Sequence, residues 1–478
     1  MTLINKIEVL SKEDLTRVHE ASLKILQEIG VVFLSEEAIE RFKHHGAKVN
    51  GNIVYLSPKM VEDALEKCPS QFKWRARNDT HSLIVGKGFH VHATQGLIYI
   101  QEGKFRRKCT LEDCVTAQKI YQASDAVSVV GGNPGDPADI DKRVKHLYFT
   151  YVALKHTDKP FFPYCTHTEG YVVSEVSQIM DMFEIAVGAK DYLKKNYCLA
   201  NICGPISPLT YPADVLGVIS EYVKRNQPIH LYSAPMAGIT GPLSLFGTSV
   251  LVNAEILAGI VLIQLMNPGN PVVYTPMASV ADMKRANANY ASPEAMLINI
   301  ANCQLGQALY HLPTRTLCGG NNAKTVNCQA GYETMQNMML ATLAGVHLFG
   351  LSLGCLDNWT TTSFEKLLID IELFERMKRI VQGVDTSEKA LSLDLIKEVG
   401  PGGSYLTHQD TLAHFRQIWM PGISDWESYA TWKDAGSEDV MDRANRKCKE
   451  ILDSSPESMI DEALDKELRQ YISMVING

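Results

Sequence analysis

The chain has 478 residues, 45% hydrophobic and 21% charged, which is typical of a globular protein with a large core. Its formal net charge of -8 argues against nucleic-acid binding, which needs a concentrated basic surface. The apolar stretch 250–266 is interrupted by Asn253, Glu255 and Gln264, so it indicates a buried helix and no membrane span. The polar N-terminus and the 11 cysteines without a C-x-x-C pair predict a cytoplasmic protein.

Residues 1–89 are expected to form an N-terminal helical cap. Apolar side chains recur at helical spacing between Leu15 and Ile29, after Ser11 and two acidic residues that are typical of a helix start. A second helix is predicted over 35–45. A third begins at Ser57-Pro58, because a proline in the first helical turn loses no hydrogen bond.

From residue 90, short apolar or β-branched runs alternate with longer helical stretches. The eight candidate strands are 90–96, 127–133, 161–166, 197–204, 229–235, 271–278, 313–321 and 346–354. Eight parallel strands with intervening helices close a barrel, so we expect an α/β fold with a (β/α)8 TIM barrel over 90–362. An open doubly wound sheet is the alternative, weakened by the lack of G-x-G-x-x-G after the first strand. Residues 363–478 are expected to form a C-terminal helical region packed on the barrel.

The predicted strand ends are rich in small, neutral residues and poor in Lys and Arg. Since phosphate and polycarboxylate sites gather Arg and Lys, this composition favours a cationic or uncharged ligand. Backbone N–H groups at Gly319-Gly320 could instead cradle a phosphate. The aromatic residues Tyr164, Tyr232 and Phe349 lie in or after predicted strands, and aromatic faces attract quaternary ammonium groups. Core packing is the alternative role for each of them.

Other chemistries have weaker signals. Cys165 and His167 could meet Cys203, Cys318 and Cys355 at the strand ends, but a zinc site needs three or four converging ligands, and we predict no metal. No G-x-S-x-G, P-loop or H-E-x-x-H motif occurs, so acyl and phosphoryl transfer are disfavoured.

Four segments carry a more specific signal: CGGNNAK at Cys318–Lys324, QAGYE at Gln329–Glu333, NICGPISP at Asn201–Pro208 and SFEKL at Ser363–Leu367. With residues 414–416 and 432–444, they resemble the trimethylamine methyltransferase family over almost the whole chain. The resemblance implies a barrel enzyme that demethylates methylamines and passes the methyl group to a corrinoid protein. Archaeal members carry pyrrolysine in the barrel, whereas this chain has ordinary residues throughout 318–322. Relatives without pyrrolysine include enzymes for glycine betaine and other quaternary amines.

The resemblance therefore implies methyl transfer from a quaternary amine to cobalamin carried by a partner protein. A quaternary ammonium leaves as a neutral amine, so no general acid is needed, and the enzyme mainly positions its reactants in a dry pocket. We expect Tyr164, Tyr232 and Phe349 to cage the ammonium group. The expected polar contacts to the rest of the substrate are Asn201, Asn321, Asn322 and His347. Room for the corrin ring is expected at Cys318, Gly319 and Gly320.

Three alternatives stay open at this point. The chain could demethylate a tertiary or secondary amine or another methyl donor, bind betaine without catalysis, or use zinc for methyl transfer. We also expect a homo-oligomer. The particular amine is decided by a few side chains in one cavity, which sequence patterns do not identify.

Overall fold

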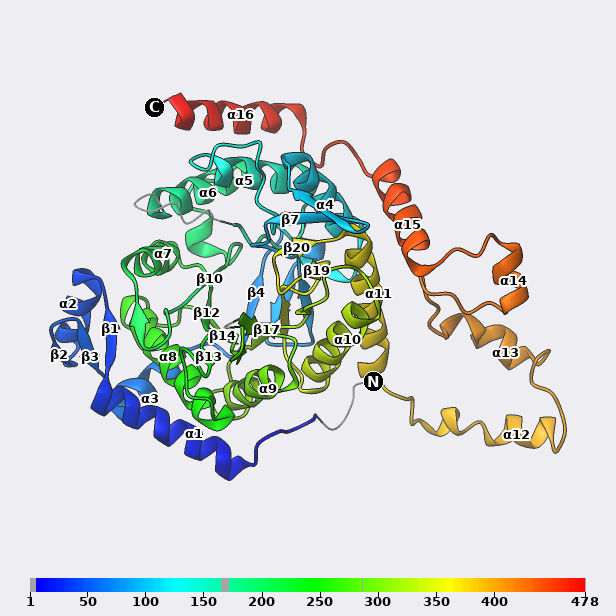
Figure 1. The fold of residues 1–478 in the computed structure, drawn as a ribbon, viewed down its shortest axis with the longest axis horizontal. Coiled ribbons are helices and arrows are strands. Elements are labelled where there is room, and N and C mark those ends of the chain that lie inside the picture. Colours follow the sequence, from blue (N-terminus) through cyan, green and yellow to red (C-terminus); the bar gives the residue numbers. More distant parts are fainter. Residues whose placement is uncertain (1–5, 165–171, 286, 478) are drawn as a thin grey trace.

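The computed structural model describes residues 6–164, 172–285 and 287–477. It has a mixed α/β fold in which a ring of helices surrounds a central group of strands (Figure 1). The central strands are β6 (His90–His92), β9 (Val127–Val129), β10 (Asn201–Cys203), β12 (Ile229–Ser233), β14 (Val272–Pro276), β17 (Arg315–Leu317) and β18 (Leu348–Gly350). Each lies inside a predicted strand. In the remaining predicted strand, Phe161 forms single bridges, and residues 165–166 lie outside the described part of the chain.

The central strands pair in parallel. One sheet has the order β10-β12-β14, and a second contains β17-β18-β6-β9. Single parallel bridges join the two sheets on both sides: Tyr274 to Thr314 on one, and Val130 to Phe161 and Phe161 to Leu199 on the other. Each central strand, and Phe161, therefore has a parallel neighbour on both sides.

Helices cover the outside of these strands. They are α4 (Leu111–Ala123), α5 (Lys145–His156), α6 (Val172–Val187), α7 (Ala213–Lys224), α8 (Leu245–Met266), α9 (Pro293–Ala308), α10 (Cys328–Leu343) and α11 (Phe364–Val381). Side-chain caps define several starts; the Ser292 hydroxyl, for example, accepts a hydrogen bond from the Ala295 N–H, with Pro293 in the first turn. Helix α8 is long and apolar enough to cross a membrane, but 83% of its most apolar window is buried inside the protein. Neighbours on every side explain its uniformly apolar sequence.

The N-terminal region is not purely helical. The three expected helices are present as α1 (Lys12–Lys24), α2 (Glu36–His44) and α3 (Pro58–Lys67). Between them lie β1 (Val31–Phe33), β2 (Lys48–Asn50) and β3 (Ile53–Tyr55), which form a four-stranded sheet with β11 (Thr210–Tyr211). The strands were not predicted beside the helices, because strands of two or three residues are too short for a visible alternation.

A hairpin of β4 (Phe72–Trp74) and β5 (Leu83–Val85) lies where the central strands begin. The Arg75 N–H donates to the carbonyl of Tyr197, just before β10, and the Trp74 indole N–H donates to the carbonyl of Cys198 at 2.8 Å. The fully buried Trp74 ring packs against His92 and His230, with ring centroids 5.6 Å and 5.5 Å away. The hairpin thus fills the amino-terminal end of the strand assembly.

Small sheets follow the opposite, carboxyl ends of the central strands. One consists of β7 (Tyr99–Glu102), β8 (Phe105–Lys108), β19 (Cys355–Leu356) and β20 (Thr361–Thr362). The other consists of β13 (Met236–Ala237), β15 (Ser279–Asp282) and β16 (Asn287–Asn289). They are built from the segments after β6, β18, β12 and β14, so they surround the end of the fold at which these four strands finish.

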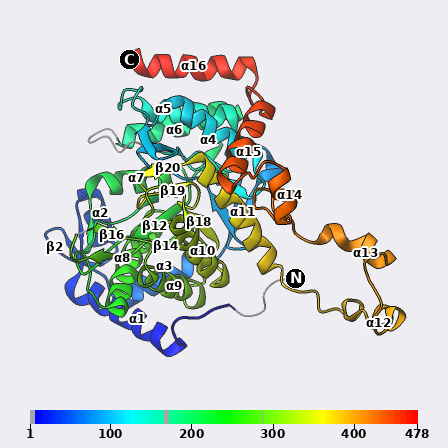
Figure 2. The same ribbon diagram turned by 45° about the vertical axis from the view of Figure 1, so that its right-hand side comes forward.

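The C-terminal region is helical, as expected, but only part of it packs on the body. Helix α15 (Val440–Ser454) contacts α4 and α11, and α16 (Glu462–Asn477) contacts α5 and α6. The segment between α11 and α15 carries α12 (Leu393–Val399), α13 (Gln409–His414) and α14 (Tyr429–Asp434) and extends away from the body in both views (Figures 1 and 2). The expectation that all of 363–478 packs on the central fold is therefore corrected for this arm.

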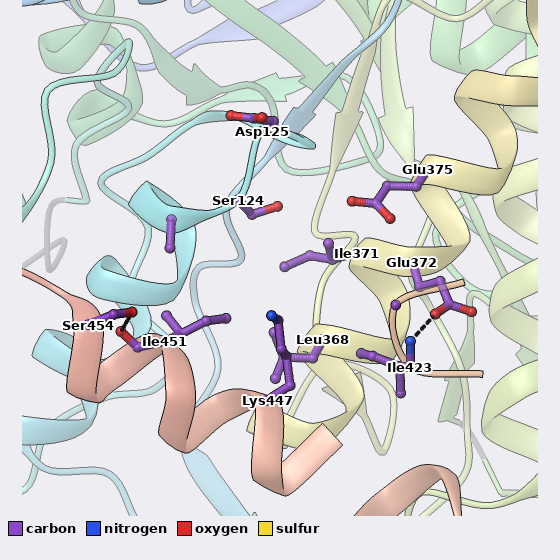
Figure 3. Close-up of a pocket in the computed structure, with 12 residues that line it drawn as sticks. Ser124, Asp125, Leu368, Ile371, Glu372, Glu375, Ile423, Lys447, Ile451 and Ser454 are labelled. Atoms are coloured by element: carbon purple, nitrogen blue, oxygen red, sulfur yellow. Dashed lines mark hydrogen bonds between the residues drawn. The ribbon is translucent and has the colours of Figure 1, made fainter. Parts of the chain in front are cut away.

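A cavity of about 380 Å³ lies where this arm returns to the body, between α4, α11 and α15 (Figure 3). The Glu372 carboxylate in it accepts hydrogen bonds from the backbone N–H groups of Ile423 and Ser424 at 2.6 Å and 3.0 Å. Apolar side chains of Leu368 and Ile451 line the same space. This cavity lies among helices outside the central strands, at the junction between the C-terminal region and the body.

Candidate active site

The interior of the strand assembly carries a layer of large side chains. Three rings pack together: His92 on β6, His230 on β12, and Phe162, which directly follows Phe161. The ring centroid of Phe162 lies 5.0 Å from that of His92 and 5.2 Å from that of His230, and those of the two histidines lie 5.4 Å apart. The Arg315 guanidinium carbon on β17 lies 5.9 Å from the centre of the Phe162 ring. These four residues come from alternate strands, an arrangement that fills the interior of parallel barrels. Unlike the usual aliphatic layers, this one is polar.

Arg315 is buried, with 1% of its surface exposed. Its Nη1 lies 3.8 Å from the Met277 sulfur, and its Nε has no hydrogen-bond partner. Within the described residues, no Asp or Glu side chain forms an ion pair with this guanidinium. Burial lowers the pKa of Arg315 to about 10, so the group stays charged at neutral pH.

The Arg315 side chain reaches the carboxyl ends of the neighbouring strands. Met277 follows the last residue of β14, and a Cβ added to Gly350, the last residue of β18, would overlap the guanidinium. A glycine at position 350 is therefore required for this placement of the arginine. The cation therefore lies at the carboxyl ends of the central strands, which is where parallel α/β folds bind their ligands.

The two histidines of this layer are neutral. Burial, reinforced by the positive charge of Arg315, lowers the pKa of both His92 and His230 well below the ordinary value of 6.5. In the described part of the chain, neither ring nitrogen of His230 has a hydrogen-bond partner, and the same holds for Nε2 of His92. Buried polar atoms without partners are rare in folded proteins, and a cluster of them indicates a ligand or ordered water.

Aromatic side chains lie further toward the mouth. Half-buried Tyr232 on β12 is paired in register with Thr275 and lies on the same face of its strand as His230. Burial raises the pKa of Tyr232 to about 12, with smaller contributions from groups that include Tyr290. The rings of Tyr290 and Trp359, also half-buried, have centroids 4.0 Å apart. Tyr290 and Trp359 thus form a packed pair in the segments after β14 and β18, and Tyr232 lies two residues beyond His230 on β12.

Two of the residues predicted to bind substrate lie elsewhere. Phe349 faces the outer helices, where its ring packs against Phe89 and Phe374 at centroid distances of 5.1 Å and 5.4 Å. His347 precedes β18, at the amino-terminal end of the strand, and its Nδ1 accepts a hydrogen bond from the Thr314 N–H. Successive side chains of a strand point to opposite faces, so Phe349 is excluded from the interior by the same register that places Gly350 there.

The residues predicted to leave room for the corrin ring have close protein neighbours. Cys318 is buried in the core between strands and outer helices, with Met296 and Met338. A Cβ on Gly319 would lie 2.6 Å from the backbone of Ser352, so the next loop fills the space that this glycine leaves. At Gly320 the neighbouring atom is Cζ2 of Trp359, 3.1 Å from an added Cβ. Both glycines allow close packing of protein segments.

The predicted amide contacts divide. Asn201 pairs in register with Ile229, whose side chain lies in the core beneath the helices, so the same face is expected of Asn201. Asn321 is buried and donates from Nδ2 to the carbonyl of Cys355 at 2.5 Å, which ties two mouth loops together. Half-buried Asn322 donates to Asn289 Oδ1 at 2.9 Å on the rim of the mouth.

Tyr164 is half-buried and its ring meets Phe149 of α5 edge-on, 5.6 Å between centroids. It directly precedes residues 165–171, so the candidate zinc ligands Cys165 and His167 lie outside the described part of the chain. Among residues 6–164, 172–285 and 287–477, no three His, Cys, Asp or Glu side chains are grouped as a metal site.

Sequence patterns missed two residues of this region, Arg315 and Tyr290. Arg315 is the only charged residue of the predicted strand 313–321, and a charge inside a strand buried on both faces is the signal that could have identified it. Tyr290 had no such signal, because β15 and β16 lie in a segment without clear periodicity.

The mixed α/β fold is similar to that of a crystal structure of MtmB in complex with hydroxylamine. The two chains are 11% identical and superpose with a TM-score of 0.51, over 93% of this chain and 89% of that one. Residues 1–475 match the model of the family described as trimethylamine methyltransferase (MTTB). The chain belongs to the trimethylamine methyltransferase family.

Three relatives are similar in sequence to this chain over most of their length. A glycine betaine methyltransferase of Desulfitobacterium hafniense is 35% identical over 98% of both chains. A proline betaine:corrinoid methyltransferase of Eubacterium limosum is 32% identical over 86% of both chains. The trimethylamine methyltransferase MttB of Methanosarcina barkeri is 28% identical over 98% of this chain and 95% of its own.

Proposed function

We propose that this protein transfers a methyl group from a betaine-type quaternary amine to cob(I)alamin on a corrinoid protein. The observation that carries the proposal is the presence of aromatic side chains in this region: Tyr232 on β12 and the packed rings of Tyr290 and Trp359. Aromatic faces attract quaternary ammonium groups, which cannot donate hydrogen bonds. The two betaine methyltransferases among the relatives support the same substrate class.

The proposed scaffold is a (β/α)8 barrel over residues 90–362, flanked by regions 1–89 and 363–478. The parallel pairs and single bridges form one continuous ring of eight positions, which supports a closed barrel over an open doubly wound sheet. The protein is further proposed to act in the cytoplasm and as a homo-oligomer. Exposed apolar side chains on the arm, among them Leu406, Phe415 and Tyr429, are consistent with a protein–protein contact.

In this proposal the side chains bind and orient, and no proton needs to be moved. Tyr232, Tyr290 and Trp359 hold the ammonium group and displace water from around it. The leaving group is a neutral tertiary amine, so the reaction needs no general acid, and none of the predicted contacts is an acid–base pair. Cob(I)alamin supplies the nucleophile when the corrinoid protein is docked. Because opposite charges disappear as the reactants combine, a site of low polarity favours the reaction.

The rim of the mouth fits a corrinoid. It carries uncharged amide and aromatic side chains, among them Asn289, Asn322, Asn358 and Trp359, all partly exposed. A corrin is a flat ring with amide substituents, for which amide hydrogen bonds and aromatic faces are suitable partners. The cobalamin is proposed to stay on the partner protein. The ordinary residues at 318–322 support a reaction without pyrrolysine.

The test is an assay with cob(I)alamin and a panel of glycine betaine, proline betaine, carnitine, γ-butyrobetaine, choline and trimethylamine. Methylation of cobalamin by a betaine but not by trimethylamine is the expected result. Methylation by trimethylamine alone would replace the proposed substrate by a tertiary amine. Absence of transfer from every donor, with the protein folded and the cobalt reduced, would overturn the proposal and favour a betaine-binding protein. Loss of activity on chelation would identify a zinc enzyme.

A further inference from the structure

We infer that Arg315 binds the carboxylate of the substrate inside the strand assembly, and that this contact selects zwitterionic amines over choline and trimethylamine. The inference rests on the proposed function and specifies its substrate class. It assigns a specificity-determining role to a residue in the middle of a central strand, beneath the aromatic rings that hold the ammonium group.

The first argument is the missing counter-charge. The guanidinium is 99% buried and contacts the Met277 sulfur and the Phe162 ring, with no carboxylate paired to it among the described residues. Other buried cations in this protein are neutralised or fully hydrogen-bonded: Lys366 pairs with Asp370, and the Lys159 ammonium donates to three carbonyl oxygens. An unpaired buried charge is costly, and proteins retain one where a ligand completes it.

The second argument is the set of donors around this cation. Neutral imidazoles of His92 and His230 lie in the same layer, and ring nitrogens of both lack partners in the described chain. A neutral imidazole carries one N–H group and can donate it to a carboxylate, while a guanidinium offers paired donors of matching geometry. Arg315 and the two histidines together provide donors and no competing anion. This combination suits one planar, singly charged carboxylate.

The third argument is the direction of the layers. His230 and Tyr232 lie two residues apart on the same face of β12. Two residues of a strand span about 6.6 Å, so the donor layer and the aromatic layer are separated by roughly the length of a small amino-acid betaine in contact with both. The carboxylate enters first and the methylammonium group stays nearer the mouth. The N-methyl groups then face the side from which the corrinoid protein approaches.

Selection follows from the same geometry. Choline and trimethylammonium bring a cation without an anion, so they leave the guanidinium unpaired and are repelled by its charge, which little solvent screens. A betaine supplies the counter-charge together with the cation. Arg315 thus favours binding of the zwitterion and opposes binding of a bare cation.

The experiment measures binding of glycine betaine and of choline by isothermal titration calorimetry, with thermal unfolding of each ligand-free protein. Arg315→Met keeps a similar side-chain volume without the charge. We expect R315M to bind glycine betaine more than 100-fold more weakly than the wild type, with a Tm equal to or higher than that of the wild type. Arg315→Lys, which keeps the charge but loses the paired donors, should show an intermediate affinity.

The matched control is Arg225→Met. Arg225 forms an ion pair with Asp181 at 3.0 Å and a hydrogen bond to Ser177 on the outer helices, and it precedes the amino-terminal end of β12, opposite the carboxyl ends of the strands. R225M should unfold at a lower temperature and bind glycine betaine as the wild type does. Retention of betaine affinity within threefold in R315M would overturn the inference. So would a wild type that binds choline as tightly as glycine betaine, or that binds no carboxylated amine.

The assay with cob(I)alamin separates this inference from the proposed function. Arg315-dependent betaine binding without methyl transfer would contradict the function and leave the carboxylate site intact. Methyl transfer from choline or trimethylamine but not from betaines would keep a corrinoid methyltransferase and overturn the assignment of Arg315.

Discussion

Lys366 and Asp370, one turn apart on α11, form an ion pair in which 1% and 0% of the two side chains are exposed. Lys366 Nζ also donates to the Thr334 hydroxyl of α10 at 3.0 Å, and the Asp370 carboxylate accepts from the Gly354 N–H at 2.8 Å. Thr334 is in turn 3.4 Å from Nδ2 of Asn321. The pair therefore fixes the two loops, after β17 and β18, that form part of the mouth.

Replacing Lys366 by Met is expected to lower the free energy of unfolding by about 3–5 kcal/mol, because Asp370 then stays buried without a counter-charge. Denaturant titration measures the change. The double variant K366M/D370L removes both charges and should recover part of the loss. Equal stability of K366M and the wild type would contradict a structural role for this pair.

Glu255 on α8 predicts a pH dependence. Its carboxylate accepts hydrogen bonds from the Ser233 hydroxyl at 2.6 Å and from the Leu209 N–H at 2.7 Å, yet burial outweighs these bonds and raises the pKa of Glu255 above 4.5. A carboxyl group with a raised pKa in the folded state favours folding at low pH, and this contribution is lost as pH rises through the folded pKa. The wild type should therefore lose stability relative to E255Q between pH 4.5 and neutral pH.

The measurement is urea unfolding of the wild type and E255Q at both ends of that pH range. Glu28→Gln, at an exposed position on the N-terminal helix, corrects for the loss of one negative charge. A difference between the wild type and E255Q that stays constant with pH, or that moves in the opposite direction, would contradict the raised pKa.

The proposed ammonium cage is tested by Tyr232→Leu. Loss of one desolvated cation–π contact is worth about 1.5–2 kcal/mol, so the Kd for glycine betaine should rise roughly 10- to 30-fold. Tyr232→Phe keeps the ring face and should bind within about threefold of the wild type. Calorimetric titration gives both values. An unchanged Kd in Y232L would remove Tyr232 from the cage.

Phe349→Leu distinguishes the position of Phe349 against the outer helices from the substrate contact that was expected from the sequence. Since this ring packs between Phe89 and Phe374, its replacement should lower the stability by roughly 1 kcal/mol, the difference between typical Phe and Leu core deletions. The Kd for glycine betaine should stay within twofold of the wild type. A large increase in Kd at unchanged stability would return Phe349 to the substrate site.

Sequence patterns predicted the helices and the central strands well, because each of these elements has a recognisable pattern of residues. Helices α2 and α3 begin after a serine whose hydroxyl accepts from the third following N–H, and the predicted starts agree within one residue. Strands of two or three residues, such as β13 and β19, have no period to detect. The projection of the arm away from the body was not predicted, because its helices have the same residue composition whether or not they pack on the body.

The site was harder to predict than the fold. The sequence predicted which residues lie near strand ends, but not whether each side chain faces the interior or the outer helices. A shift of one residue along a strand changes the face, as Phe349 and Gly350 illustrate. Tyr232 was selected because it is an aromatic residue in a predicted strand, a criterion that does not distinguish the two faces of the strand. Arg315 was passed over because composition at the strand ends, where charge is scarce, gives no information about the layer beneath.

The central claim is tested most directly by one turnover of glycine betaine in which all three N-methyl groups are deuterated, with cob(I)alamin as acceptor and mass spectrometry of both products. The account predicts N,N-dimethylglycine and labelled methylated cobalamin in equal amounts, and no methylated cobalamin from choline labelled in the same way. Dimethylglycine without methylated cobalamin, or methylated cobalamin from choline alone, would contradict it.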